Sequence, residues 1–203
     1  MELFLYEGKD EEKVLNKALE DLSLTKDEIL YKKETKKGGL FKSTTYKYTI
    51  VKMEEITEYV KTVLEDILTR MNLNVKYETS IRNKQINIKM FSDNNAILIG
   101  KNGQTLSALT LLTKQAVFNQ VGVFPYINLD VENYKDKQIM HLERLARNIA
   151  KEVRETKTPV TMENMNSYER RIVHNALNDF KGIKTESEGE EPNRCVVVKP
   201  KND

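Results

Sequence analysis

The amino-acid sequence predicts an α+β protein built from three small units. Apolar residues at helical spacing occur in several separate segments, and short alternating segments typical of strands lie between them, mostly in adjacent pairs. The 203 residues, 39% of them hydrophobic and 32% charged, supply enough apolar side chains for real cores. We find no internal repeat. We expect the three units to cover residues 1–52, 53–132 and 133–203.

The first unit is predicted to have the order β-α-β-β. A short strand around Leu3–Leu5 precedes Asp10, a residue suited to cap a helix. The helix that follows carries one apolar stripe, formed by Val14, Leu15, Ala18, Leu19 and Leu22. Thr25 with Glu28 indicates a second cap or turn, and strands are expected at 28–35 and 44–52, joined by a turn at Gly38-Gly39.

The second unit is predicted to have the order α-β-β-α-α-β. It opens with a helix over 55–71, followed by strands at 73–80 and 84–91 joined across Arg82-Asn83. Asp93 or Asn94 is expected to cap a short helix that stops at Gly100. A longer helix starts after Gly103, with an apolar stripe formed by Leu106, Leu109, Leu112 and Ala116, and a strand follows Pro125 over 126–131.

The third unit is predicted to contain two helices and two short strands. The apolar stripe of its first helix is formed by Ile139, Leu142, Leu145, Ala146, Ile149, Ala150 and Val153. Pro159 falls after that helix, and Asn166 with Glu169 predicts a capped second helix running to about Phe180. Strands at 183–187 and 194–199 close the chain, joined by an acidic turn.

The first candidate site is the loop Gly100-Lys101-Asn102-Gly103 between the two helices of the second unit. Glycine lets another backbone approach closely, the free N–H groups at the start of a helix favour phosphate, and Lys101 adds a positive charge. The alternative is that two glycines only make a tight turn. A GxxG spacing alone is weak evidence for a binding site, but its position between a short and a long helix makes the motif specific.

The second candidate site is the segment Arg170-Arg171-Ile172-Val173-His174 on the last predicted helix. Arg170 and His174 lie about 40° apart on a helix. We expect them to flank a buried stripe of Ile172, Val173, Ala176, Leu177 and Phe180, while Arg171, Asn175 and Asn178 point away. Arginine suits forked contacts with phosphate or bases, and histidine can bind phosphate or stack on a base. The alternative is that the histidine holds the strands against the helix.

Positive charge is local rather than global. The formal net charge is only +2. Lysines gather over residues 31–48, and the helix of the third unit carries a basic polar side that includes Arg144, Arg147 and Lys151. Phosphate binding needs such local charge, although basic runs are more often plain solvated surfaces.

These motifs resemble known nucleic-acid-binding domains. The GxxG loop within α-β-β-α-α-β resembles the KH domain in its prokaryotic, type II order, and NSYERRIVHNAL resembles the RxxxH (R-three-H) domain. Both domains behind a small β-α-β-β unit resemble the Jag (SpoIIIJ-associated) family of bacterial proteins over essentially the whole chain. The sequence departs from that family's pattern around Gly39 and Phe41, and at Cys195, where a basic residue is common.

The resemblance implies binding of single-stranded RNA, with single-stranded DNA as a second option. It implies that Gly100, Lys101, Asn102 and Gly103 clamp the strand, that Ile97 and Ile99 line an apolar groove beside them, and that Arg170 and His174 form the signature pair. It also implies a small single-KH partner protein, and post-transcriptional regulation linked to cell elongation, cell shape or membrane-protein insertion. Whether the protein also forms a homo-oligomer is left open.

Other classes of function find little support in the sequence. No metal-binding motif, phosphate-binding P-loop or nucleophile–base pair is present, so we expect no catalysis, metal or other cofactor. One cysteine, Cys195, no signal-like start and no apolar run of membrane length lead us to expect a cytoplasmic protein. The alternative to RNA binding is a protein-interaction scaffold whose nucleic-acid affinity is weak or vestigial.

Overall fold

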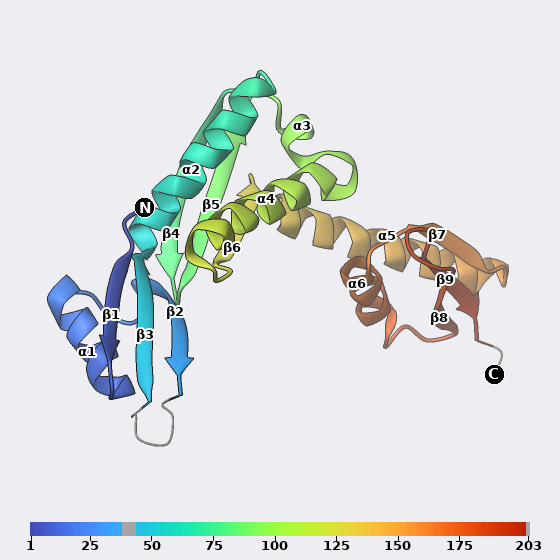
Figure 1. The fold of residues 1–203 in the computed structure, drawn as a ribbon. Coiled ribbons are helices and arrows are strands. Elements are labelled where there is room, and N and C mark those ends of the chain that lie inside the picture. Colours follow the sequence, from blue (N-terminus) through green and yellow to red (C-terminus); the bar gives the residue numbers. More distant parts are fainter. Residues whose placement is uncertain (38–43, 202–203) are drawn as a thin grey trace. The chain divides into compact units, whose positions relative to one another are not determined.

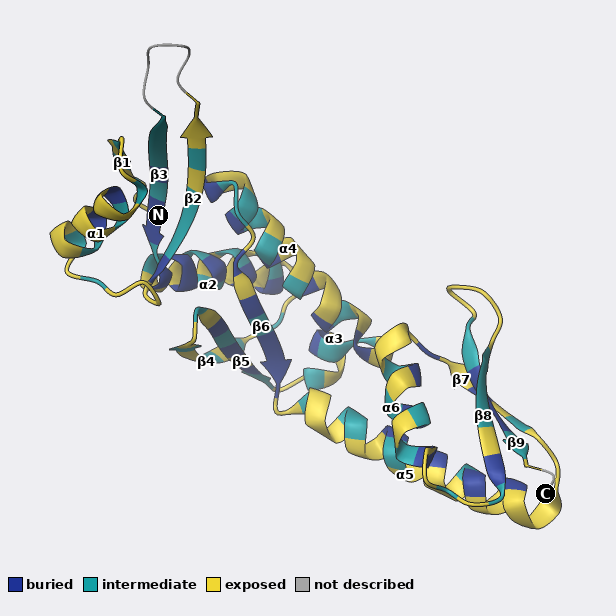
Figure 2. Cartoon of the chain, turned by 90° about the horizontal axis from the view of Figure 1, so that it is seen from below, coloured by how far each residue is buried: buried dark blue, intermediate teal, exposed yellow. Residues whose placement is uncertain are grey.

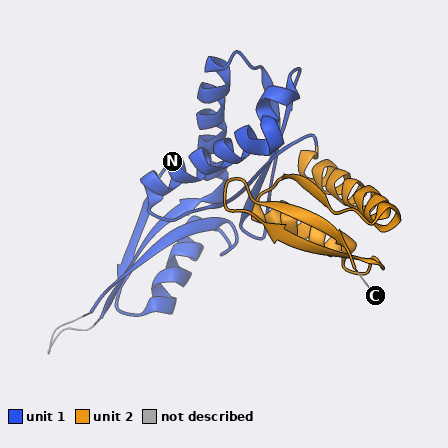
Figure 3. Cartoon of the chain, turned by 90° about the vertical axis from the view of Figure 1, so that its right-hand side faces the viewer, with its two compact units in different colours: residues 1–132 blue, residues 133–203 orange. Residues whose placement is uncertain are grey.

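The computed structural model describes residues 1–37 and 44–201. The chain forms two compact units, the first over residues 1–132, which contains the first two predicted units, and the second over residues 133–203 (Figure 3). The α+β fold class is confirmed, with helices packed on three small sheets (Figure 1). The division of residues 1–132 into two domains at 52/53 stays a prediction. The predicted turn at Gly38-Gly39 lies outside the described residues.

An antiparallel sheet and one helix open the first unit. The elements are β1 (Phe4–Gly8), α1 (Glu11–Leu22), β2 (Ile29–Lys36) and β3 (Thr45–Lys52), with the strand order β1-β3-β2. One sheet face packs on α1 through a core that includes Val14, Ala18, Ile29, Tyr48 and Ile50. Both predicted local caps are confirmed: Asp10 accepts from the N–H of Lys13, and Glu28 accepts from the N–H and hydroxyl of Thr25.

The rest of the first unit has the predicted order α-β-β-α-α-β. It comprises α2 (Met53–Arg70), β4 (Val75–Arg82), β5 (Gln85–Ser92), α3 (Asn95–Ile99), the single 3-10 turn η1 (Lys101–Gly103), α4 (Gln104–Val121) and β6 (Tyr126–Val131). Its sheet has the order β4-β5-β6, with β6 parallel to β5. Alternate residues of β5, most residues of β6 and one face each of α2 and α4 are buried (Figure 2).

Two predictions about this unit are wrong in detail. The buried face of α4 runs through Leu106, Leu109, Thr113 and Val117, whereas Leu112 is 52% exposed and Ala116 is half-buried. A threonine takes the core position because its hydroxyl donates to the carbonyl of Leu109, which satisfies it without water. Neither Asp93 nor Asn94 caps α3 with its side chain; instead the Asn95 side chain accepts from the N–H of Ser92.

The second unit packs two helices on a third sheet. It comprises α5 (Tyr134–Thr156), β7 (Val160–Asn164), α6 (Ser167–Leu177), β8 (Ile183–Glu188) and β9 (Cys195–Pro200), with the antiparallel order β7-β9-β8. The predicted capping box of Asn166 and Glu169 is confirmed.

The sequence analysis missed β7 and misjudged two helix details of this unit. The strand β7 is short, and its register with β9 shifts between Thr161 and Asn164, so it lacks a clean alternation. Leu145, expected in the apolar stripe of α5, is exposed. The helix α6 ends at Leu177 instead of near Phe180. In the described part of the chain, no helix is both long and apolar enough to cross a membrane.

Candidate nucleic-acid interface

The backbone of the GxxG loop takes a shape that depends on glycine. Gly100 has φ 71° and ψ 178°, a region that essentially only glycine occupies. A Cβ built there would lie 2.2 Å from the Thr105 hydroxyl oxygen and 2.9 Å from the Thr105 backbone nitrogen. Gly103 is buried with φ 75° and ψ 14°, and Asn102 between them is also left-handed, with φ 51°. The spacing of the glycines is therefore fixed by local geometry.

Backbone hydrogen bonds within the loop hold its shape, and its two middle side chains are exposed. The N–H of Gly103 donates to the carbonyl of Gly100, and that of Gln104 donates to the carbonyl of Lys101. Lys101 and Asn102 are exposed, and neither side chain has a hydrogen-bond or ion-pair partner among residues 1–37 and 44–201. No side chain caps the N-terminus of α4, so the positive end of an 18-residue helix stands beside Lys101.

Apolar side chains accompany the loop on α3. Ile97 is 44% exposed and Ile99 is half-buried, while Leu98 between them is fully buried and anchors the helix. Leu106, on the first turn of α4, is buried and belongs to the core. The positively charged, hydrogen-bonding loop therefore lies beside partly exposed apolar side chains of α3.

Arg170 lies on the buried face of α6 instead of flanking it. Its side chain is 9% exposed, and its Nη1 donates to the carbonyl of Met165 at 2.7 Å and to the Glu191 carboxylate at 2.9 Å. The buried row of α6 is Arg170, Val173 and Leu177, at helical spacing. The guanidinium fastens the start of α6 to the β8–β9 connection.

His174 connects the same helix to β8. Its two ring nitrogens lie 2.7 Å from the Thr185 hydroxyl and 2.8 Å from the Ser187 hydroxyl, so both are engaged. Burial, and then the positive charge of Arg170, lower the pKa of His174, which favours the neutral ring. This arrangement supports the structural alternative for the signature pair. The partners Thr185, Ser187 and Glu191 carried no sequence signal, because they come from a distant, polar segment.

Basic residues of the second unit divide into two groups. Hydrogen bonds from Lys184 and Lys199 lower the pKa of Glu186 to about 2, so these lysines are already neutralised. The predicted contact residues Arg144, Arg147 and Lys151 on α5 and Arg171 on α6 are exposed, and none has an ion-pair partner in the described residues. The three α5 residues fall within about 60° on the helix and form one stripe, which we call the α5 basic stripe.

The histidines, cysteine and carboxylates of the described chain form no metal-binding cluster. No group of three histidine, cysteine, aspartate or glutamate side chains that could hold a metal ion occurs among the residues with a described position. His141 is exposed on α5, and Cys195 is half-buried with its thiol near the carbonyl of Glu188.

Comparisons with known proteins identify two domain families in this chain. A family model described as the KhpA/KhpB KH domain matches residues 57–122, and the model of the R-three-H (RxxxH) domain matches residues 140–200. The chain is similar to RNA-binding protein KhpB of Clostridium symbiosum, at 35% identity over all of this chain and 94% of that protein. It is also similar to RNA-binding protein KhpB of Bacillus subtilis, at 33% identity over 96% of both chains.

A similar protein with a longer chain, RNA-binding protein KhpB of Streptococcus pneumoniae strain D39, is 29% identical over 71% of this chain and 43% of its own length. The two nearly full-length matches cover the KH loop and the RxxxH helix in the same order. This chain therefore belongs to the KhpB family, the same Jag family that its motifs indicated.

Proposed function

We propose that this protein binds single-stranded RNA without catalysing a reaction, and that the GxxG loop is its main contact. One observation carries this proposal: the glycine-dependent backbone presents Lys101 and Asn102, both without a partner among the described residues, beside the uncapped N-terminus of α4. Positive charge and free N–H groups at one point match a phosphate backbone. The relatives' name, RNA-binding protein, supports RNA as the ligand.

The other predicted residues take different roles in this proposal. Ile97 and Ile99 contact bases, because they are the partly open apolar side chains beside the loop. The α5 basic stripe and Arg171 add phosphate contacts to longer strands. Arg170 and His174 act as positioning residues that hold α6 to the β8–β9 connection and to β8, since Nη1 of Arg170 and both ring nitrogens of His174 are bonded within the protein.

The double substitution Lys101→Asp with Asn102→Asp tests the main contact. It places two negative charges where phosphates would lie, so RNA affinity should fall by about a hundredfold or more, which corresponds to about 3 kcal/mol. Fluorescence anisotropy with labelled single-stranded RNA of 4 and 20 nucleotides, and with matched DNA, measures the change. Asn16→Asp with Lys26→Asp is the matched control, because these exposed residues lie far along the chain from the loop. Unchanged affinity in a folded Lys101/Asn102 variant would exclude the loop as the binding site.

A second observation favours a protein partner in addition to RNA. The solvent-facing side of α4 carries Leu111, 65% exposed, and Leu112, 52% exposed, and Lys114 is the only charged residue of the whole helix. Beyond its end, Phe124 stacks on Phe118 and is half exposed. Large exposed apolar side chains that gather on one helix with little charge are typical of a binding surface. We propose that it contacts a small single-KH protein; the matching KH model bears the names of both KhpA and KhpB.

The partner surface can be separated from the RNA site by mutation. Leu111→Glu with Leu112→Glu should abolish co-purification with a small single-KH protein from the same organism while leaving the affinity for a four-nucleotide RNA within about twofold. Light scattering of the purified chain would show whether the same substitutions also dissociate a homo-oligomer. If the variant still binds the partner, α4 is not the contact.

For its cellular role, we propose a bacterial cytoplasmic protein that regulates RNAs after transcription, with effects on cell elongation or membrane-protein insertion. The basis is the family membership. Crosslinking RNA to the protein in cells and sequencing the recovered strands tests it. Recovery of no RNA above the level of the Lys101/Asn102 variant would favour a scaffold role.

A further inference from the structure

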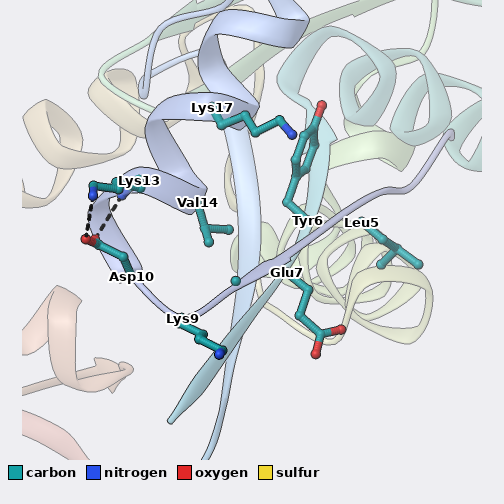
Figure 4. Close-up of a pocket in the computed structure, with 9 residues that line it drawn as sticks. Leu5, Tyr6, Glu7, Lys9, Asp10, Lys13, Val14 and Lys17 are labelled. Carbon is teal, nitrogen blue, oxygen red and sulfur yellow. Dashed lines mark hydrogen bonds and ion pairs between the residues drawn. The ribbon is translucent and has the colours of Figure 1, made fainter. Parts of the chain in front are cut away.

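The N-terminal sheet carries a groove that neither proposed activity uses. It lies between β1 and α1, has a volume of about 640 Å³, and is lined by residues of β1, of the connection to α1, and of one side of α1 (Figure 4). Leu5, Tyr6 and Val14 supply its apolar surface, and Lys9, Lys13 and Lys17 supply its positive charges.

One wall of the groove is the open edge of a sheet. The strand order β1-β3-β2 leaves β1 paired with β3 alone among the described strands. Backbone N–H and C=O groups of alternate residues therefore point away from the sheet, which is a template for another strand. The strand β1, FLYEG, has no proline or lysine to block another strand, and it exposes Leu5 by 63%.

The two sides of this edge differ chemically. Tyr6 faces the side of α1, where Figure 4 shows Lys17 reaching toward it, and Leu5 and Glu7 point the other way. Lys13 and Lys17 lie one helical turn apart on α1. Lys13 is paired with Asp10 at 3.7 Å, whereas Lys9 and Lys17 have no ion-pair partner in the described residues.

We propose that this groove binds an extended acidic segment of another protein, which adds to β1 as a fourth strand. Alternate carboxylates of the segment face the lysines beside α1, and the apolar side chains between them cover Leu5. Single-stranded nucleic acid fits less well, because it has no peptide N–H and C=O groups to complete the hydrogen-bond ladder along β1. The inference does not depend on RNA binding by the KH loop.

Synthetic peptides test strand addition on the full chain. The probe is an eight-residue peptide alternating valine and glutamate, capped at both ends. The controls are the valine–lysine counterpart and a version with a central proline, which cannot complete the backbone ladder. Backbone NMR signals of residues 4–17 report binding. We expect saturable shifts with the acidic peptide, and at least tenfold weaker binding of both controls.

Two matched variants locate the site. Lys9→Glu with Lys17→Glu should lower the affinity for the acidic peptide by roughly tenfold, because two exposed attractive contacts become repulsive. Lys26→Glu with Lys36→Glu makes the same change of charge on exposed residues outside the groove and should leave binding within twofold. The proposal is overturned if no acidic peptide shifts residues 4–17, or if the proline version binds equally well. It is also overturned if single-stranded RNA, and not peptide, shifts them.

Discussion

The GxxG loop and the Arg170/His174 pair are both short family signatures, yet their side chains occupy opposite environments. The loop uses its backbone shape for structure and leaves Lys101 and Asn102 in solvent. The pair does the reverse, because its side chains bond to Met165, Glu191, Thr185 and Ser187. One signature leaves its middle side chains exposed, and the other bonds its side chains within the fold that carries the α5 basic stripe.

This difference shows why a motif cannot be equated with a contact. Arginine and histidine are the side chains expected to touch nucleic acid, but Arg170 is buried and its Nη1 already bonds a carbonyl and a carboxylate within the protein. In the proposed function, the RNA contacts of the second unit then come from the exposed residues Arg144, Arg147, Lys151 and Arg171.

The largest expected effect in this comparison is on stability. Arg170→Ala should lower the free energy of unfolding of residues 133–203 by about 2–3 kcal/mol, because it removes two charge-assisted hydrogen bonds and leaves the Met165 carbonyl without its donor. Arg171→Ala, at the exposed neighbour, should stay within about 0.5 kcal/mol. Amide hydrogen exchange of β8 and β9 in the full chain compares the two. Equal protection in both variants would refute the structural role of Arg170.

Charge reversal on α5 should affect long RNA selectively. Arg144→Glu, Arg147→Glu and Lys151→Glu together should reduce the slope of log affinity against log salt by about 2 for a 20-nucleotide strand, since three phosphate contacts are lost at roughly 0.7 each. Binding of a four-nucleotide strand at the loop should change little. A slope that stays the same would remove the α5 basic stripe from the interface.

A smaller effect is expected from pH, through His174. Its pKa is lowered in the folded protein, so the unfolded chain takes up a proton more readily and stability is lost as pH falls below about 6.5. His174→Gln keeps a polar side chain that does not titrate, and should flatten the dependence in this window. Hydrogen exchange of β8 between pH 7.5 and 5.5 measures it. A wild-type protein that is equally protected at both pH values would contradict the assigned shift.

The smallest effect should come from Glu191, the exposed partner of Arg170. Its side chain is 60% exposed, so Glu191→Gln should cost about 1 kcal/mol or less, while the bond from Arg170 to Met165 remains. Amide hydrogen exchange of β8 and β9 in the Glu191→Gln variant measures this loss. A loss as large as that of Arg170→Ala would mean that the ion pair, and not the buried bond to the backbone, fastens α6.

The sequence predicted what depends on local rules and missed what depends on distant partners. The loop was identifiable because Gly100 and Gly103 are needed by the backbone itself. The burial of Arg170 was not, because a hydropathy pattern counts arginine as polar and Glu191 lies 21 residues away. Thr113 was overlooked as a core residue because a hydropathy pattern also counts threonine as polar, although its hydroxyl is satisfied within its own helix. The strand β7 was missed because its irregular register hides the alternation.

A single NMR titration tests the contrast between the two signatures most directly. Four-nucleotide single-stranded RNA is added to the full chain, and the backbone signals of residues 100–105 are followed together with the side-chain signals of Arg170 and His174. We predict saturable shifts in the loop, with the Arg170 and His174 signals unchanged at saturation. Shifts of the Arg170 guanidinium or the His174 ring, with a silent loop, would contradict the account.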